Sequence, residues 1–458
     1  MTELTAPTGF AGEWIRPIDP GYDDARRVWN AAIDRRPALV ARPAATPDVA
    51  LAVRYARERH LPIAVRGGGH SPAGHSTGDG AVVIDLRSLG EVEVDARRRT
   101  ARVGGGTLLS ALDKAGQAHG LVVPVGVIGH TGVGGLTLGG GMGRLQNKFG
   151  LTIDNLQAVE VVLADGSIVT ASSDEHPDLF WAIRGAGHNF GVVTRFEFRL
   201  RPFDGKLNRS VRLYDGRYVH DVWAMAAQLA ETVPDEVSFT FGIGRAVPES
   251  DYPDDVAGRP MAFVAVNHCG DAADVERDTA ALLGGPAPFN TLSGQVDYVT
   301  IQTANDEAMA WGKRSYIDGL FTNGLSAGTL DAAVQHVASA PGEAGIGLAR
   351  FGGAVRRVAE DATAFPSRTA AFEMSADAGA WDDAADDDRY IGWCREAMAI
   401  LARDACPGRY VNEISDDGDG VARSIYGDAK YDQLARLKRA WDPDNVFRSN
   451  QNIEPAAG

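Results

Sequence analysis

The stretch RGGGHSPAGHS, residues 66–76, places a histidine directly after three consecutive glycines. The apolar run LPIAV (61–65) before it predicts a strand that runs into Gly67, Gly68 and Gly69. A strand that ends in consecutive glycines offers several backbone N–H groups with no side chains in the way, and this geometry cradles a phosphate. A tight turn is the alternative, and one glycine run does not decide between the two.

Two further glycine-rich runs favour the phosphate-binding interpretation. They are GHTGVGGLTLGGGMGRLQNKFGLTIDNL (129–156) and RGAGHNFGVV (184–193). Clustered glycine in a folded chain marks turns or close backbone approach and not a flexible linker. The Rossmann pattern GxGxxG at the start of a helix is absent, so a nicotinamide dinucleotide site is not indicated.

Charge and hydropathy exclude several classes of partner. The 458 residues carry 45 basic and 61 acidic side chains, a net charge of −16, which repels nucleic acid and anionic membrane surfaces. No stretch of roughly 18 or more apolar residues predicts a membrane span. The start MTELTAPTGFAGEW has no export signal, so we expect a cytoplasmic protein. The three cysteines, Cys269, Cys394 and Cys406, form no CxxC pair, which argues against a zinc site or a disulfide framework.

The pattern of apolar residues divides the chain near residue 205. Before that point we predict a helix at 46–60, with Thr46 as its N-cap, and a helix at 108–120. Strands are predicted at 37–43, 61–66, 81–86, 100–106 and 189–203, with a hairpin at 156–172. From about 206, Ala-rich helices alternate with β-rich runs, and a helix at 431–441 precedes the end of the chain. We therefore predict three segments, 1–205, 206–404 and 405–458.

The three glycine runs together resemble the FAD-binding domain of the vanillyl-alcohol oxidase and para-cresol methylhydroxylase superfamily. YVNEISDD (410–417) and DPDNVFRSNQNIEP (442–455) narrow the resemblance to its berberine bridge enzyme-like branch. The resemblance implies an α+β fold. A two-part FAD-binding domain would hold an inserted substrate domain, an antiparallel sheet backed by helices, and the C-terminal segment would return to the FAD domain.

The resemblance also implies a role for the histidine after the glycines. In this family the equivalent side chain bonds covalently to the 8-methyl carbon of the flavin, and His70 stands at that position. The alternative for His70 is a turn residue that bonds its neighbours. Many relatives add a second tether through a cysteine, but Ile128 occupies that position and no cysteine lies between residues 1 and 268. We therefore expect FAD held by a single tether.

The remaining cofactor residues are assigned by the same resemblance. His130 and His188 are expected in the flavin pocket and not on a metal, because no HxH or HExxH spacing exists. Arg66 is assigned to the pyrophosphate loop, with a surface ion pair as the alternative. The full expected set is Arg66, Gly67, Gly68, Gly69, His70, Ser71, Gly74, Ser76, Ile128, His130, Gly132, Gly134, Gly135, Gly139, Gly140, Gly141, Gly191, Val192, Asn450 and Asn452.

Three residues are the candidates for catalysis. Glu413 is the fourth residue of the family's YxNx motif and the expected base, because burial beside a flavin raises the pKa of a carboxyl group. Tyr410 is expected to line the site, although residues 410 and 413 of a regular strand face opposite sides unless the strand bulges or ends there. Glu413 as the first residue of a solvated acidic loop is the alternative. The resemblance implies that Thr131 lies over the flavin face where oxygen approaches; a strand-start threonine is the alternative.

The expected reaction follows from these assignments. The protein would oxidise an alcohol or amine carbon of a small organic substrate by hydride transfer to the flavin, with O2 taking the electrons to give H2O2. Glu360, in EDATAFPSR (360–368), is a candidate acidic helper on a strand before the Phe-Pro-Ser-Arg turn. A role in secondary metabolism suits the family. A flavin dehydrogenase, an oxidative cyclase and a non-catalytic flavin-binding protein stay open as alternatives.

Overall fold

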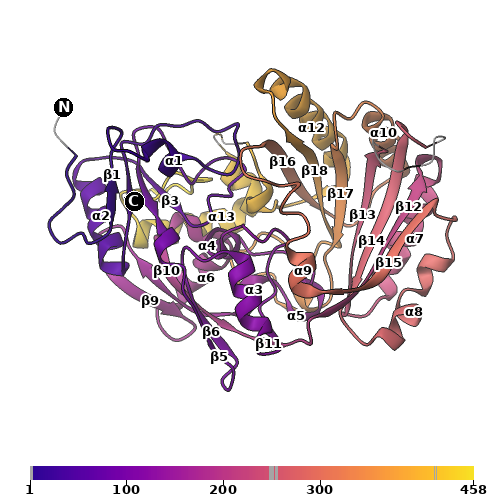
Figure 1. Cartoon of the computed structure of the whole chain (residues 1–458), viewed down its shortest axis with the longest axis horizontal. Helices are drawn as coiled ribbons and strands as arrows, with labels where there is room; N and C mark the ends of the chain where they lie inside the picture. The colour runs from indigo at the N-terminus through magenta and orange to yellow at the C-terminus, as the bar shows by residue number, and fades with distance from the viewer. Residues whose placement is uncertain (1–3, 247–251, 253–255, 417, 419, 458) are drawn as a thin grey trace.

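The chain forms two parts that lie side by side, one built on two small sheets and the other on one large sheet (Figure 1). The computed structural model describes residues 4–246, 252, 256–416, 418 and 420–457. The N-terminal residues up to about 200 form the first part, and the C-terminal helix packs back onto it.

A mostly parallel sheet carries the first glycine run. Its strand order is β1-β2-β4-β3, with β2, β4 and β3 parallel and α2 as the crossover. The bounds are β1 Glu13–Ile15, α1 Tyr22–Arg26, β2 Leu39–Arg42, α2 Thr46–Glu58, β3 Ile63–Arg66 and β4 Val82–Asp85. Because β3 ends at Arg66, the three glycines begin at the carboxyl end of a buried parallel strand, as the sequence predicts.

The helix α2 departs from the sequence prediction at its first turn. Thr46 was expected as the N-cap, but the N-cap is Ala45, which has no side-chain bond to the helix. The Thr46 hydroxyl instead donates to Glu160, 2.7 Å away. Asp48 accepts the N–H of Ala44, so a carboxylate one turn further on binds the chain at the start of this helix.

An antiparallel sheet of order β5-β6-β10-β8-β9 completes the first part. Its strands are β5 Val92–Asp95, β6 Thr100–Gly104, β8 Leu156–Val162, β9 Ile168–Ser172 and β10 Val192–Arg199. The predicted hairpin is confirmed, with Gly166 at φ 78° in its turn. The helices are α3 Leu109–Gln117, α4 Val133–Leu138, α5 Gln146–Phe149 and α6 Pro177–Ala186, and β7 Leu121–Val122 pairs with β11 Arg201–Pro202.

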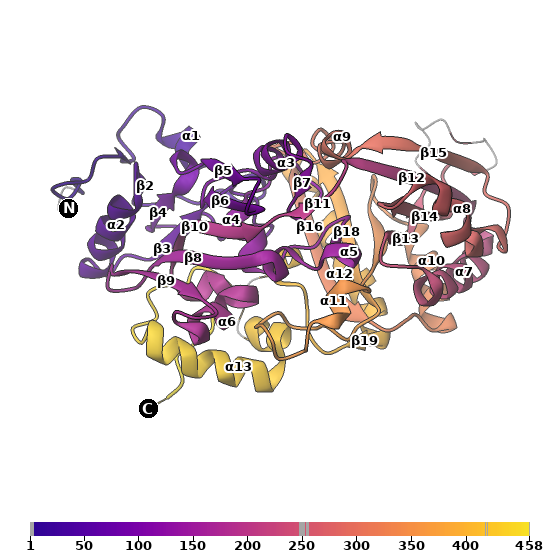
Figure 2. The ribbon, with the colours of Figure 1, turned by 90° about the horizontal axis from the view of Figure 1, so that it is seen from below.

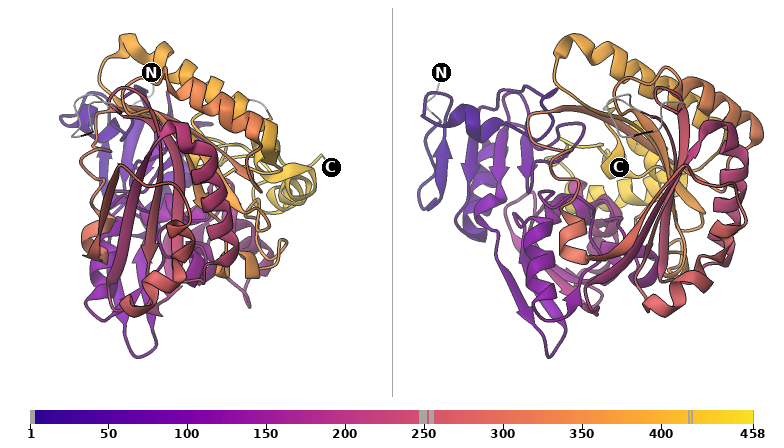
Figure 3. Two further views of the ribbon diagram at one scale, coloured as in Figure 1. Left: turned by 90° about the vertical axis from the view of Figure 1, so that its right-hand side faces the viewer. Right: turned by 45° about the vertical axis from the view of Figure 1, so that its right-hand side comes forward.

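One antiparallel sheet of order β15-β12-β14-β13-β17-β18-β16-β19 forms the second part. The strands are β12 Lys206–Asp215, β13 Val237–Arg245, β14 Pro260–His268, β15 Asn290–Asp297, β16 Arg314–Thr322, β17 Gly345–Arg350, β18 Phe372–Trp381 and β19 Ala405–Cys406. The helices are α7 Val219–Thr232, α8 Val275–Asp278, α9 Tyr298–Gln302, α10 Ala327–Val337, α11 Ala354–Arg357 and α12 Asp387–Leu401. The long helices cover the face that points away from the first part (Figure 3).

Strand β18 shows how this sheet separates a core from a site. Met374, Ala376 and Ala378 pack into the hydrophobic core under α7, α10 and α12. Because side chains alternate along a strand, Glu373 and Asp377 lie on the opposite face, toward the first part of the chain. The acidic residues of this strand therefore reach the interface between the two parts.

The C-terminal helix α13, Val421–Trp441, is longer than predicted and bends at Gly427, where φ is 69°. It runs beside α6 (Figure 2). Lys438 on this helix is fully buried, pairs with Asp442 at 2.7 Å, and donates to the carbonyls of Asn189 and Phe447. This cation therefore fastens the last segment of the chain to the first part.

We expect Lys438→Met to lower the free energy of unfolding by about 3 kcal/mol or more, because it leaves Asp442 buried without its cation. Urea denaturation measures the change. Arg423→Met is the control, since Arg423 pairs with Asp428 and Asp432 at the surface and such pairs contribute about 1 kcal/mol or less. Equal losses in the two variants would contradict this account of Lys438.

Candidate active site

A cavity of about 440 Å³ lies between the two parts of the chain. Its wall combines the glycine runs, the turn at 410–413 and the last segment at 447–451. The predicted residues that line it are Gly67, Gly68, Gly69, His70, Ser71, Ser76, Ile128, Thr131, Gly132, Gly134, Gly135, Gly191, Tyr410, Glu413 and Asn450. Residues from widely separated stretches of sequence thus meet at one place.

Two of the glycine runs pack backbone against backbone. A Cβ on Gly68 would lie 2.2 Å from the backbone nitrogen of Gly132, and a Cβ on Gly132 would lie 2.2 Å from that of Gly68. Gly69 adopts φ 70°, a conformation that other residues rarely take. No residue with a side chain fits at either contact, so this pair explains why both runs contain glycine.

The cavity wall suits a dinucleotide with phosphates and a polar ring. The glycines leave backbone groups uncovered along the cavity, and the buried atoms His75 Nε2 and Asn450 Oδ1 have no hydrogen-bond partner in the described part of the chain. Buried polar atoms without partners are uncommon, and a bound polar group satisfies them. The residues present therefore fit FAD.

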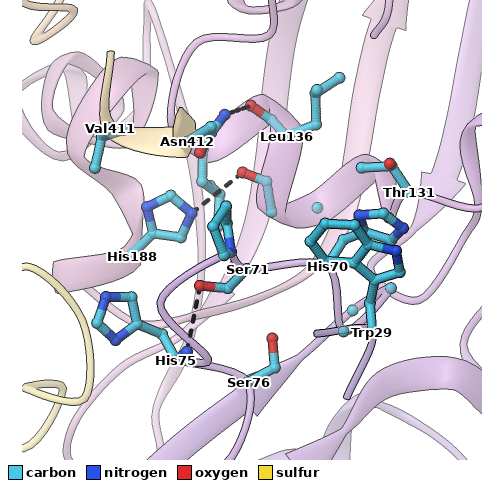
Figure 4. Close-up of a pocket in the computed structure, with 18 of the residues that line it drawn as sticks. Trp29, His70, Ser71, His75, Ser76, Thr131, Leu136, His188, Val411 and Asn412 are labelled. Atoms are coloured by element: carbon cyan, nitrogen blue, oxygen red, sulfur yellow. Dashed lines mark hydrogen bonds between the residues drawn. The ribbon is translucent and has the colours of Figure 1, made fainter. Parts of the chain in front are cut away.

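His70 presents a neutral imidazole to the cavity. Its ring stacks on Trp29, with centroids 4.4 Å apart (Figure 4). Its Nε2 lies 2.7 Å from Nδ1 of His130. Burial, and to a lesser degree His130, lowers the pKa of His70 to about 3, so the ring is uncharged at neutral pH. The described residues provide no hydrogen bond to Nδ1, the other ring nitrogen of His70.

A loop from the second part of the chain closes over this histidine. The carbonyl of Asp306 lies 3.2 Å from His130 Nε2, and the Asp306 carboxylate accepts the N–H of Gly129 at 2.7 Å. Trp29 donates its indole N–H to the carbonyl of Met309 at 2.6 Å. The loop between α9 and β16 therefore holds Trp29 and His130 beside His70, and its own Trp311 packs edge-on to the His70 ring, with centroids 6.5 Å apart.

Several predicted cofactor residues lie outside the cavity wall. Arg66 is buried and donates to the carbonyl of Ala25, so the alternative of a surface ion pair is wrong. Gly74 packs against Ile33. His188, by contrast, does line the cavity as predicted, and its Nε2 lies 3.2 Å from the carbonyl oxygen of Gly135 (Figure 4). The residues that do not line it are Arg66, Gly74, His130, Gly139, Gly140, Gly141, Val192 and Asn452.

Three of those glycines support the turn at 410–413 and its surroundings. A Cβ on Gly139 would lie 2.2 Å from the side chain of Asn412, and one on Gly140 would lie 2.5 Å from the ring of Phe365. A Cβ on Gly141 would lie 2.1 Å from Thr152 Oγ1. The glycines at 139–141 therefore lie behind the cavity wall, where the absence of a Cβ lets these side chains pack against the backbone.

Tyr410 and Glu413 would face opposite sides of a regular strand, but the turn at 410–413 lets both face the cavity. Residues Val411–Glu413 form a 3₁₀ turn in which the Glu413 N–H donates to the Tyr410 carbonyl at 3.0 Å. Both side chains line the cavity, because the chain is not a strand here. Asn412 donates to the Leu136 carbonyl (Figure 4) and to the Tyr410 hydroxyl, each at 3.0 Å, and so fixes the turn to α4.

Glu413 belongs to a group of three carboxyl groups. Glu413 and Asp377 line the cavity, and Glu373 lies behind them. Burial raises the pKa of all three carboxyl groups above the usual range. The alternative that Glu413 begins a solvated loop is wrong, because its side chain faces the cavity.

The prediction for Glu360 is wrong. Residues 360–371 contain no strand, and β18 follows the Phe-Pro-Ser-Arg turn instead of preceding it. Glu360 accepts the N–H of Arg368 and pairs with Lys430 on the protein surface. The acidic residues that reach the cavity region come from FEMSADAGAW (372–381), whose alternating pattern was the available signal.

Thr131 and Ile128 both line the cavity. Thr131 lies in a turn just before α4, with its N–H bonded to the Ile128 carbonyl, so the alternative of a strand-start threonine is wrong. Cys269, Cys394 and Cys406 are free and belong to the second part of the chain and the start of the last segment. Ile128 therefore presents an apolar side chain where many relatives carry the second tethering cysteine.

Sequence reasoning missed cavity residues both inside and outside the motifs. Trp29 precedes the first motif, and Asn305, Met309, Ser315 and Ile317 belong to the second part, where no motif marks them. The missed lining residues include Trp29, His75, Asn305, Met309, Ser315, Ile317, Asp377, Asn412, Phe447, Ser449 and Gln451. In the described ranges, no group of three His, Cys, Asp or Glu is placed to hold a metal ion. Within the same ranges, no helix is long and apolar enough to cross a membrane.

Comparison with known proteins agrees with this fold. A family model described as FAD binding domain matches residues 37–172, and one described as Berberine and berberine like matches residues 409–454. The chain is 32% identical to (R)-6-hydroxynicotine oxidase of Paenarthrobacter nicotinovorans, over 99% of both chains.

Solved structures extend the likeness to three dimensions. The crystal structure of 6-hydroxy-D-nicotine oxidase from Arthrobacter nicotinovorans matches with a TM-score of 0.87 at 29% identity, over 99% of this chain and 100% of that chain. The BBE-like 1 protein of Physcomitrella patens shares the fold with a TM-score of 0.87 at 24% identity, over 98% of both chains. The protein is therefore an FAD-linked oxidoreductase with the vanillyl-alcohol oxidase type of fold. Within that class it belongs to the berberine bridge enzyme-like family.

The contact between the two glycine runs yields a test of the cofactor site. We expect Gly132→Ala to reduce the FAD content of purified protein at least tenfold, because the added Cβ would overlap the backbone of Gly68 and push the two runs apart. Absorbance of the flavin relative to protein measures the loss. Gly328→Ala on α10, where a Cβ meets open space, should leave the content unchanged. Normal FAD content in Gly132→Ala would show that the backbone contact is not required.

Proposed function

We propose that the protein oxidises the carbon next to the nitrogen of a small organic amine, with FAD tethered through His70 and O2 as the electron acceptor. The carbon of an alcohol is the alternative substrate group. The observation that carries the proposal is the charge of the cavity wall. Asp377 and Glu413 line it, whereas no lysine or arginine does among the residues that the structure describes.

An acidic wall without a cation favours a substrate that brings its own positive charge. Carboxylates held out of water attract a cation more strongly than they would in bulk solvent, and they repel carboxylate and phosphate groups. An amine that arrives protonated supplies the missing charge, whereas an alcohol does not. The resemblance to (R)-6-hydroxynicotine oxidase supports the same class of substrate.

The proton of the amine has a nearby acceptor in Glu413. An ammonium group cannot lose a hydride from its neighbouring carbon until it has lost a proton, because the nitrogen lone pair must be free. Burial raises the pKa of Glu413 and so brings it closer to that of an amine, which makes this carboxylate a better base than an exposed one. Tyr410 and Asn412 hold the turn that aims it.

FAD supplies the oxidising step when bound, because it accepts the hydride from the substrate carbon, and O2 then takes the two electrons to give H2O2. The product is the iminium ion of the amine. Thr131 lines the cavity with a small side chain, and a small residue at this position supports an oxidase over a dehydrogenase or cyclase. A non-catalytic flavin-binding protein would have little use for an ionisable group held in this cavity.

The role proposed for His70 is testable with denatured protein. We expect wild-type protein that is precipitated in acid and cleared of small molecules to give a yellow, fluorescent pellet, whereas the His70→Ala pellet is colourless. Because Ile128 cannot form a second bond, loss of the one tether removes all the flavin. The control is His119→Ala, which changes an exposed histidine. A yellow His70→Ala pellet or a colourless wild-type pellet would contradict a single histidyl tether.

The class of substrate is tested with pairs of amines and alcohols of the same shape. We expect amines to reduce the flavin faster, and Asp377→Asn to lower kcat/KM for amines at least tenfold, since a charge-assisted contact contributes about 1.5–3 kcal/mol. The matched alcohols should change little. Stopped-flow reduction without oxygen and H2O2 release in air measure the two half-reactions. Fast reduction without H2O2 would favour the dehydrogenase or cyclase, and equal preference for alcohols would reject the amine.

A further inference from the structure

Two glutamates from distant parts of the chain meet beside Gly319 on β16. A Cβ on Gly319 would lie 2.9 Å from Oε1 of Glu373 and 3.7 Å from Oε2 of Glu413. The missing side chain therefore leaves the space in which the two carboxyl groups come together, and a side-chain hydrogen bond joins them. Two carboxyl groups form a hydrogen bond with each other only when one of them carries a proton.

The two glutamates have different surroundings. Glu413 lines the cavity, whereas Glu373 is only 3% exposed and lies behind the cavity wall. No donor among the described residues bonds to its Oε1. Burial raises the pKa of both carboxyl groups. The charge of Glu413 raises the pKa of Glu373 further. The hydrogen bond from Glu373 lowers the pKa of Glu413. Because Glu373 is the more buried of the two carboxyl groups, the neutral, protonated form is favoured on Glu373.

The neighbouring elements supply no cation to the pair. On β18 the next acidic group is Asp377, which raises the pKa of Glu413 further, and the turn adds Tyr410. Arg409 bonds to Asp318 and to the carbonyl of Gly319, so its charge is already engaged. Strand β17 presents only Gly345, Gly347 and Ala349 on this face. A shared proton is therefore what relieves the repulsion between Glu373 and Glu413.

We propose that Glu373 is a positioning residue that retains one proton and donates it to Glu413, which keeps the Glu413 carboxylate ionised and held toward the cavity. The proposal rests on the proposed function of Glu413 as the base. The Glu373 proton stays in place while the substrate's proton passes to Glu413. Glu373 itself touches neither substrate nor flavin.

A matched pair of variants separates the hydrogen bond from the bulk of the side chain. Glu373→Gln keeps a neutral donor of the same shape, and Glu373→Met keeps the shape without the donor. Flavin reduction by an amine is fast above the pKa of Glu413, where this carboxyl group is ionised, and slows as the pH falls below that pKa. We expect the acid limb of kcat/KM to stay within about half a pH unit in Glu373→Gln and to rise by about one unit or more in Glu373→Met.

Infrared difference spectroscopy tests the same proton without any turnover. We expect the holoenzyme at neutral pH to show the C=O stretch of a protonated carboxyl group that both Glu373 variants lack. Glu360→Gln, at the surface, should remove no such band. This readout remains available if no amine reduces the flavin, so failure of the proposed function and failure of the shared proton are distinguishable.

Two outcomes would overturn the proposal. If Glu373 is ionised, Glu373→Gln removes a like charge, and the acid limb moves to lower pH while the variant spectra lose a carboxylate band. If Glu373 only fills space, Glu373→Met matches the wild-type pH profile. Both outcomes differ from the expected pattern, in which Glu373→Gln keeps the wild-type acid limb of kcat/KM and Glu373→Met shifts it to higher pH.

Discussion

The backbone contact between Gly68 and Gly132 is the constraint on which the site depends. Each glycine stands where a Cβ would overlap the other's backbone, so the two runs approach as closely as two chains can. That approach brings His70 within reach of His130, which precedes Gly132 by two residues. The glycines thus do more than loosen the chain, because they determine where the imidazole lies.

The interface between the two parts of the chain supplies what the glycine runs lack. The large sheet turns its apolar face to α7, α10 and α12, and its other face carries Glu373 and Asp377 toward the cavity. The loop between α9 and β16 holds both Trp29 and His130 beside His70. The first part therefore lines the cavity with its glycine runs and His70, and the second part adds the carboxyl group of Asp377. This division follows from the alternation of side chains along a strand.

The sequence predicted most of the strands of the first part and the glycines and His70 of its cavity wall, because backbone requirements leave a local mark. A strand that ends in glycines is visible in the letters at 61–69, and the β3 strand confirms it. The prediction for Glu360 was wrong because an acidic side chain reaches the cavity only from the right position on a strand. The local sequence pattern did not show where that strand lies. Trp29 and Met309 reach the site only through tertiary contacts, so no motif could mark them.

The proposed function places two opposing demands on Glu413. A base must be ionised, yet burial among Asp377 and Glu373 opposes ionisation. A hydrogen bond from a protonated neighbour stabilises the charged form without bringing in a cation, which would weaken the attraction for a cationic substrate. An arginine at position 373 would also keep Glu413 ionised, but it would neutralise the wall and lower the basicity of the carboxylate. A second carboxyl group that holds one proton therefore suits an amine-oxidising site better than an ion pair does.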